Sequence, residues 1–271
     1  MEFSEIEARG LVLLGCGKMG SALLAGWLER GLSPGAVWVI DPAPSGWVAS
    51  LEGIHLNEDL PPSPAVVLVA VKPQMMGDAL PSMTALGGGD TLFVSIAAGT
   101  PIARFEEVLG QGTPIVRAMP NTPAAISRGI TALVGNDPAG ADGLALAEGL
   151  LSAVGQTVRL ESEAQMDAVT AVSGSGPAYV FHLIETLAAA GEAEGLSPDL
   201  ALQLARATVA GAGALAEASD ESPAQLRINV TSPGGTTQAA LEVLMDEKGG
   251  FPDLLTRAVA AAANRGRELA K

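Results

Sequence analysis

Two hydroxyl side chains follow a proline and a glycine pair in the last third of the chain. Residues 232–237 read Ser-Pro-Gly-Gly-Thr-Thr, and an apolar run suited to a helix follows at once. The first N–H groups of a helix have no partner inside the helix and carry the positive end of the helix dipole. Such a helix start can hold a small anion such as a carboxylate. We therefore expect a small anionic substrate at residues 234–237, the Gly-Gly-Thr-Thr turn.

A separate glycine turn lies near the N-terminus, where residues 15–20 read Gly-Cys-Gly-Lys-Met-Gly between an apolar run and a helical pattern. In that context Gly15 permits a tight turn, Gly17 lets the backbone approach a pyrophosphate, and Gly20 lets helix and strand pack closely. Asp41 ends the next apolar run, where an acid can bond a ribose 2′-hydroxyl. The turn predicts dinucleotide binding; the alternative is an ordinary strand–helix turn, with Lys18 as a solvated residue.

The elements that must position these turns change character along the chain. Short apolar runs at residues 11–14, 37–40, 66–71, 92–96 and 115–116 alternate with helical patterns, which is typical of a parallel sheet covered on both faces. After residue 161 we expect no strand, only alanine- and leucine-rich helices over 179–193, 198–216, 237–245 and 251–269, with Ser197 and Ser222 as N-caps. The predicted fold is α/β: a Rossmann-type doubly wound parallel sheet in residues 1–162, then an all-α domain in 163–271.

Composition excludes several classes of partner and site. The 271 residues carry a formal net charge of −15, which disfavours nucleic acid and anionic membrane surfaces. The single cysteine, Cys16, allows no internal disulfide and supports no zinc cluster, so we expect a packing residue there and no metal site. No signal-peptide pattern opens the chain and no uninterrupted apolar stretch could span a bilayer. We expect a soluble cytoplasmic protein.

Three further segments end predicted strands, where ligands of doubly wound sheets gather. These segments are residues 70–74, 95–100 and 117–123. The small side chains of Ala97 and Ala98 would let a flat ring lie close, and Asn121 could pair with a carboxamide. Lys72 is equally a ligand contact or a charged strand end, and for Arg117 a structural ion pair is favoured over a substrate contact.

Together these segments resemble the pyrroline-5-carboxylate reductase family. The matching segments occur in the family's order and span nearly the whole chain, and the last two are specific to it: 15–20, 70–73, 95–99, 117–123, 171–179 and 230–237. The resemblance implies NAD(P)H-dependent reduction of L-1-pyrroline-5-carboxylate to L-proline, the final step of proline synthesis. It also implies a homodimer through the helical domain, with active sites between a cofactor domain and helices near the dimer interface. In many members of the family the dimers assemble further, often into a decamer of five dimers.

The resemblance also assigns residues. It implies a catalytic role for Thr237 and substrate binding by Ser232, Gly234, Gly235, Thr236 and Thr237. The implied cofactor-binding residues are Gly15, Gly17, Lys18, Met19, Gly20, Asp41, Asn57, Val71, Lys72, Pro73, Ala97, Ala98, Met119, Pro120 and Asn121. The cofactor is NADPH, NADH or both. Because no arginine or lysine lies between Gly31 and Val71, we expect a weaker preference for NADPH than the family norm.

Several alternatives stay open. Thr237 could orient the ring nitrogen and assist proton delivery, or it could be structural; His182, on an apolar helix, is expected to be a core histidine. A β-hydroxyacid dehydrogenase shares the two-domain plan but needs a lysine on a helix of the second domain. The only lysines after Ser162 are Lys248 and Lys271, and neither suits that role. A reductase of another cyclic imine, or a cofactor-sensing protein without turnover, are the remaining alternatives.

Overall fold

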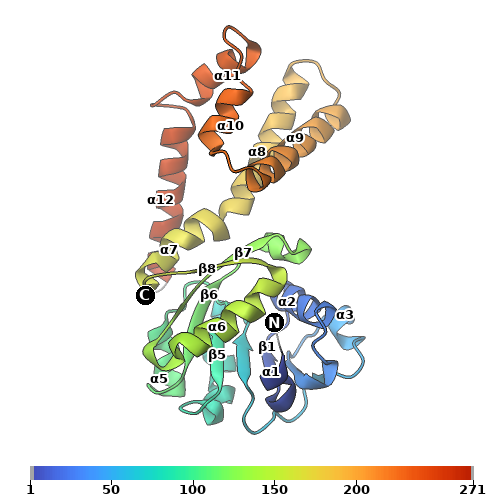
Figure 1. Ribbon diagram of the computed structural model, residues 1–271, viewed down its shortest axis with the longest axis vertical. Coiled ribbons are helices and arrows are strands. Elements are labelled where there is room, and N and C mark those ends of the chain that lie inside the picture. The colour runs from blue at the N-terminus through green and yellow to red at the C-terminus, as the bar shows by residue number, and fades with distance from the viewer. Residues whose placement is uncertain (1–2, 270–271) are drawn as a thin grey trace. The chain divides into compact units, whose positions relative to one another are not determined.

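The computed structural model describes residues 3–269, so the two ends of the expected domains, residues 1 and 271, lie outside the described residues. Within this range one eight-stranded sheet has the order β3-β2-β1-β4-β5-β6-β7-β8 (Figure 1). The strands are β1 Leu11–Leu14, β2 Val37–Ile40, β3 His55–Leu56, β4 Val66–Val69, β5 Leu92–Ser95, β6 Ile115–Met119, β7 Gly129–Gly135 and β8 Gly155–Arg159.

Helices connect the strands and then form the rest of the chain. Those before residue 160 are α1 Ser4–Arg9, α2 Lys18–Glu29, α3 Gly46–Ala49, α4 Met76–Ala79, α5 Ile102–Leu109 and α6 Gly140–Leu151. Those after it are α7 Met166–Val169, α8 Gly176–Ala193, α9 Pro198–Ala218, α10 Pro223–Asn229, α11 Thr236–Leu244 and α12 Phe251–Leu269. A π-helical turn, η8 Thr170–Gly174, separates α7 from α8, and the remaining helical pieces are short 3-10 turns.

The expected doubly wound sheet is confirmed, but it is not wholly parallel. All five expected strands form, whereas β6 and β7 pair antiparallel, with Val116 opposite Gly135. The sequence did not indicate β3, β7 or β8. β3 has two residues, and every residue of β8 is at least partly exposed, so neither carries the continuous apolar signal that marks a central strand.

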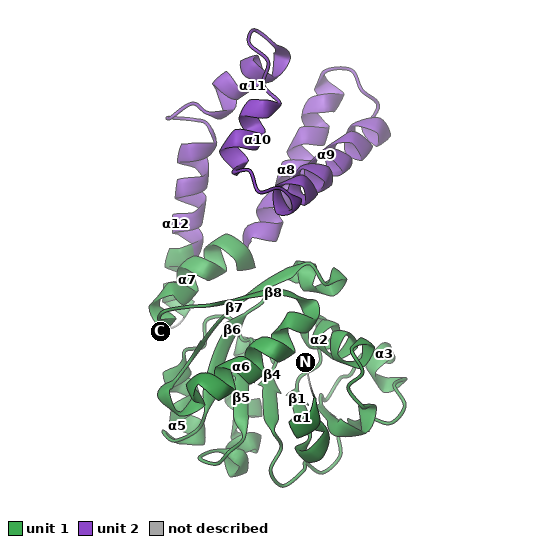
Figure 2. Ribbon diagram, in the orientation of Figure 1, with its two compact units in different colours: residues 1–174, 263–271 green, residues 175–262 purple. Residues whose placement is uncertain are grey.

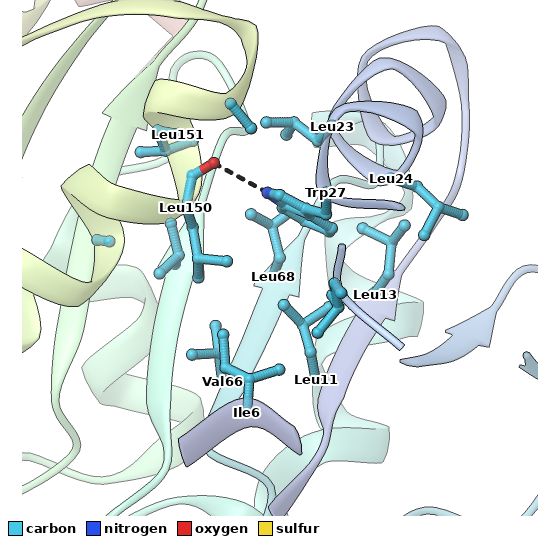
Figure 3. Packing of buried hydrophobic residues seen from close by; sticks show 14 of the residues in the cluster. Ile6, Leu11, Leu13, Leu23, Leu24, Trp27, Val66, Leu68, Leu150 and Leu151 are labelled. Atoms are coloured by element: carbon cyan, nitrogen blue, oxygen red, sulfur yellow. Dashed lines mark hydrogen bonds between the residues drawn. The ribbon is translucent and has the colours of Figure 1, made fainter. Parts of the chain in front are cut away.

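Apolar side chains cover both faces of the sheet because successive residues of a strand point to opposite sides. β1 sends Leu11 and Leu13 into one core cluster and its other two residues into a second. Figure 3 shows the first cluster, where Trp27 of α2 lies among the leucines of β1 and α6. Trp27 is fully buried, and its indole N–H donates to the Leu150 carbonyl at 2.9 Å. This bond and its surroundings fix α2, the helix that follows the glycine turn.

Residue contacts divide the chain into two units, coloured in Figure 2. The first contains residues up to 174 together with the end of α12 from residue 263, and the second contains residues 175–262. The second unit is entirely helical over its described residues. Ser222 caps α10 as expected, its hydroxyl accepting the Gln225 N–H, whereas Ser197 occupies the N-cap position of α9 without a side-chain bond. The domain boundary after residue 162 stays a prediction.

The helical unit buries little of its own apolar surface. Its core cluster consists of Ala188, Ala201 and Ala205, where α8 and α9 pack closely as an antiparallel pair. Large apolar side chains of both helices stay exposed, among them Phe181 at 58% and Leu204 at 48%. Exposed apolar side chains that gather into a large patch mark an interaction face in a folded protein.

Candidate cofactor and substrate sites

Parallel pairing brings five strand ends to one edge of the sheet. β1, β2, β4, β5 and β6 all run in the same direction, so the loops that follow them lie along the same edge. The chain proceeds from β1 outward to β2 on one side and returns through β4 on the other, which makes the gap between β1 and β4 the topological switch point. Dinucleotides bind at this position in doubly wound sheets.

The glycine turn has the shape that a pyrophosphate site needs. Gly15 has φ +84°, and an added Cβ would lie 2.8 Å from Val71 Cγ1. A Cβ on Gly20 would meet the Gly15 carbonyl oxygen at 2.9 Å, so both positions require glycine. Around Gly17, in contrast, no protein atom lies within 4 Å of an added Cβ, which leaves that side open to a ligand. No side chain caps α2, so the N–H groups of its first turn are available to an anion.

The Asp41 carboxylate faces the glycine turn. Its Oδ2 accepts the Cys16 N–H at 2.7 Å and its Oδ1 accepts the Ala43 N–H at 2.8 Å. The Asn57 side chain bonds the Asp41 backbone, with Oδ1 accepting its N–H and Nδ2 donating to its carbonyl, both at 2.9 Å. The sequence indicated neither the bond between Asp41 and Cys16 nor those between Asp41 and Asn57, since these residues are 25 and 16 positions apart.

Cys16 is a buried packing residue, 2% exposed, as expected. Burial raises the pKa of its thiol, a hydrogen bond with Ser21 opposes that shift, and the negative charge of Asp41 adds to it. The thiol therefore stays protonated and unreactive over the physiological range.

The predicted site residues in the loops after β4 and β5 differ in their exposure. Val71 packs against Gly15, and Lys72 and Pro73 are exposed at the start of a 3-10 turn. Ala97 belongs to the core and is 4% exposed. Ala98 is exposed, and of the two alanines only this one offers its methyl to a ligand.

The loop after β6 packs on the π-helical turn η8. Asn121 Oδ1 accepts the Ile130 N–H at 2.9 Å, and its Nδ2 donates to the Ser173 carbonyl at 3.1 Å. A Cβ on Gly174 would lie 2.6 Å from Met119 Cε, so Met119 packs closely against this glycine. Asn121 keeps one N–H and one lone pair for a carboxamide. π-helical turns are frequent at functional sites, and this one overlaps residues 171–179, one of the segments that carry the family resemblance.

Arg117 forms the structural ion pair that the sequence favoured. Its Nη1 lies 2.7 Å from Glu163 Oε1, and its side chain is 6% exposed. The same oxygen accepts the Ile102 N–H at the start of α5, at 2.9 Å. Arg117 therefore ties β6 to the segment that precedes α7, and we assign it no ligand contact.

The Gly-Gly-Thr-Thr turn lies in the helical unit and uses its glycine N–H groups internally. The Gly235 N–H donates to the Ser232 carbonyl at 3.0 Å, and the Gly234 N–H donates to Gln238 Oε1 at 2.7 Å. Gly234 has φ +69°, which favours glycine. α11 begins at Thr236, so the N–H groups without a helical acceptor belong to Thr236, Thr237 and Gln238. The candidate anion site is therefore shifted from the glycines toward the threonines.

Neither threonine hydroxyl forms a hydrogen bond with another part of the described chain, residues 3–269. Thr236 is exposed and Thr237 is half-buried. Two free hydroxyls beside free N–H groups offer donors and an acceptor to a small carboxylate with a nearby polar nitrogen. Sequence reasoning missed Gln238, although its position four residues after Gly234 was a usable signal.

A hollow of about 440 Å³ lies between α10 and α11. Its lining includes Arg227, Gln238 and Met245 but neither threonine of the turn. We therefore do not assign the substrate to this hollow.

Both histidines interact with neighbouring side chains. His182 is 74% exposed and pairs with Glu185 at 3.2 Å, so the expectation of a core histidine is wrong in this chain. His55 stacks on Trp38 with ring centroids 4.2 Å apart. Lys248 is exposed in the loop before α12, and Lys271 lies outside the described residues.

Residues 3–269 contain neither a metal-binding cluster nor a membrane-spanning helix. No group of three or more histidine, cysteine or acidic side chains is arranged to hold a metal ion. No described helix is both long enough and apolar enough to cross a membrane.

A glycine turn at the switch point of a Rossmann-type sheet, followed by a helical unit with many exposed apolar side chains, is typical of two-domain NAD(P)-dependent oxidoreductases. Comparisons with known proteins specify the class further. Residues 163–269 match the family model for pyrroline-5-carboxylate reductase dimerisation, and residues 11–99 match that for NADP oxidoreductase, coenzyme F420-dependent.

Relatives match over nearly the whole chain. Pyrroline-5-carboxylate reductase of Pseudomonas aeruginosa is 40% identical over 266 residues, covering 96% of this chain and 97% of the relative. The enzyme structure from Coxiella burnetii is 36% identical with a TM-score of 0.90, covering 97% of this chain and 99% of that one. A Plasmodium falciparum structure with NADP bound is 29% identical with a TM-score of 0.84, covering 98% and 99%. The chain belongs to the pyrroline-5-carboxylate reductase family.

Proposed function

We propose that this protein reduces L-1-pyrroline-5-carboxylate to L-proline with NADPH or NADH. The observation that carries the proposal is the start of α11, where two unpaired hydroxyls lie beside N–H groups that the helix leaves free. Family membership supports the same reaction. The substrate, a cyclic imine with a neighbouring carboxylate, has the groups that this turn can bind.

The substrate carboxylate accepts hydrogen bonds from the N–H groups of Thr236 and Thr237 in this proposal. Ser232, Gly234 and Gly235 shape the turn, since their backbone groups bond one another or Gln238. The positive end of the α11 dipole adds to the attraction, which helps a protein of net charge −15 to bind an anion.

The Thr237 hydroxyl orients the ring nitrogen and assists proton delivery. The reactive form is the imine protonated at nitrogen, in which the carbon of the C=N bond is electrophilic. When bound, the reduced nicotinamide supplies a hydride to that carbon, and the C=N pair moves to nitrogen to give the amine of proline. A strong base is unnecessary, because the nitrogen is already protonated before transfer.

The cofactor-binding residues expected from the sequence fall into three groups in this proposal, one for each part of the dinucleotide. Gly15, Gly17, Lys18, Met19 and Gly20 surround the pyrophosphate, because the turn is open at Gly17 and the first N–H groups of α2 are uncapped. Asp41 and Asn57 lie toward the adenosine end. The nicotinamide end takes the remaining loops: Val71, Lys72, Pro73, Ala98, Met119, Pro120 and Asn121, with Ala97 contributing backbone only.

The assembly proposed is a homodimer through the helical region, in agreement with the matched dimerisation family. Exposed side chains such as Phe181 and Leu204 would be covered in it. A decamer of five dimers remains an expectation from the resemblance, and a cytoplasmic location remains an expectation from the sequence. The net charge of −15 argues against nucleic acid and anionic membranes as partners.

The test mixes purified protein with NADPH or NADH and L-1-pyrroline-5-carboxylate, then follows loss of reduced-cofactor absorbance and formation of proline. Stoichiometric proline supports the proposal. Cofactor binding without turnover would instead indicate a cofactor-sensing protein. Faster turnover of a different cyclic imine would reassign the substrate.

A further inference from the structure

Asn57 occupies an uncommon backbone conformation directly after β3. It has φ +54°, and Ser127 is the other non-glycine residue with positive φ among residues 3–269. Asparagine tolerates this left-handed conformation better than most side chains. The Asn57 N–H donates to the Val39 carbonyl at 2.8 Å and so extends the β2–β3 ladder by one bond.

Beyond the end of β3, the Asn57 side chain forms the hydrogen bonds to β2 that a continuing strand would form. Its carboxamide accepts from the Asp41 N–H and donates to the Asp41 carbonyl, both at 2.9 Å. An amide that pairs with both backbone groups of one residue fixes the orientation of that residue, as a neighbouring strand would. Asp41 is therefore held at the end of β2, although β3 stops at Leu56.

From Asp41 the contacts continue into the glycine turn. Two adjacent bonds join the turn to the end of β2: Gly15 N–H to the Ile40 carbonyl at 2.8 Å, and Cys16 N–H to Asp41 Oδ2 at 2.7 Å. The other carboxylate oxygen accepts the Ala43 N–H, so the carboxylate is held from both sides. Asn57, Asp41 and Cys16 form a continuous chain of hydrogen bonds that ends in the turn.

We propose that Asn57 is a positioning residue for the cofactor pyrophosphate, acting through Asp41 on the glycine turn. This inference rests on the proposed cofactor binding at that turn. By fixing the Asp41 backbone, the Asn57 side chain directs the carboxylate to the Cys16 N–H and fixes the turn before the cofactor arrives. Preorganisation of this kind raises affinity because less order has to be imposed on binding.

The resemblance implies a different role for Asn57, a position near the adenine ribose. A probe that lacks adenosine distinguishes the two roles. Nicotinamide mononucleotide retains the phosphate that the turn would hold but has no adenine ribose. A turn-positioning residue affects binding of this probe, whereas a residue that contacts only adenosine does not.

The variant to test is Asn57→Gly, which removes the carboxamide and permits positive φ. Ser127→Gly is the matched control, because it makes the same kind of change at the other positive-φ position. We expect Asn57→Gly to raise KM for NADPH and NADH by the same factor, about tenfold. The inhibition constant of nicotinamide mononucleotide should rise equally, while kcat and the KM for pyrroline-5-carboxylate at saturating cofactor stay unchanged.

A double-mutant cycle tests the route through Asp41. In an Asp41→Ala background the link to Cys16 is already broken, so adding Asn57→Gly should have no further effect on cofactor KM. Additive effects would overturn the route, and an unchanged inhibition constant for the mononucleotide would overturn the positioning role. Unfolding midpoints of all variants identify any that fail to fold, and the cycle then proceeds with Asn57→Ser. Absence of activity in the wild type would count against the proposed function instead.

Discussion

Replacing Thr237 by alanine should lower turnover while leaving stability nearly unchanged. Within residues 3–269 the Thr237 hydroxyl has no hydrogen-bond partner, so its removal breaks no intramolecular bond. The residue is half-buried in the first turn of α11, where alanine is a better helix former. The free energy of unfolding should therefore change by less than about 0.5 kcal/mol.

The catalytic loss should be much larger. A hydroxyl that takes part in proton delivery contributes about 10²–10⁴-fold to kcat. One that only orients a charged group through a hydrogen bond contributes roughly 1.5–3 kcal/mol, or about 10–150-fold. We therefore expect kcat to fall at least about tenfold, with the KM for the cofactor unchanged because the residue belongs to the substrate turn.

Steady-state kinetics and thermal unfolding of three variants check this reasoning. Thr236→Ala removes the adjacent unpaired hydroxyl and is the matched control, with a small effect on kcat expected. Thr237→Ser restores the hydroxyl and should recover most of the activity. Wild-type kcat in Thr237→Ala would refute the catalytic role, as would equal losses in Thr236→Ala and Thr237→Ala.

Four further outcomes are expected. Gln238→Ala removes the side chain that accepts the Gly234 N–H at 2.7 Å, a loss of about 1 kcal/mol in substrate-binding free energy, and should raise the KM for pyrroline-5-carboxylate several-fold. An unchanged KM in initial-rate kinetics would show that the turn keeps its shape without Gln238. Leu204→Glu places a charge on the exposed apolar face of α9 and should shift the protein toward monomers in sedimentation velocity, whereas Gln203→Glu on the same helix should not. Trp27→Phe leaves the Leu150 carbonyl without its 2.9 Å donor and should cost about 1–3 kcal/mol in denaturant unfolding; a cost below about 0.5 kcal/mol would contradict that bond's importance. The wild type should use NADH measurably, and Asp41→Asn should shift the kcat/KM ratio toward NADPH while weakening both cofactors, because an asparagine cannot accept both the Cys16 and the Ala43 N–H.

Much of the fold could be predicted because burial in a doubly covered sheet is encoded in consecutive residues. β1 and β4 are apolar at every position, and both are buried at every position. The long helices of the second half were predicted to within a few residues by composition and proline placement. β7 and β8 were not predicted from the sequence. The pairing of β7 depends on its neighbours, since it runs antiparallel to β6 and parallel to β8, and β8 is an exposed edge strand.

The two glycine turns were visible in the sequence for a local reason. A glycine requirement arises from backbone angles and close approach, and the neighbouring strand and helix patterns show where such a turn occurs. The positions of the N–H groups that the Gly-Gly-Thr-Thr turn leaves free were not visible. They depend on which acceptors Gly234 and Gly235 find, and the structure gives Gln238 and Ser232.

By itself the sequence determined the class of fold, the two turns and the family, because each is recorded in contiguous residues. Only the tertiary structure decided what the polar side chains around those turns bond. Arg117 meets Glu163 across 46 positions, and Asp41 meets Cys16 across 25. A hydrogen bond requires two atoms about 3 Å apart, and only the packed sheet brings atoms so distant in sequence to that separation. That is why the sequence did not indicate that the Asp41 carboxylate bonds the glycine turn, or that Asn57 bonds the Asp41 backbone.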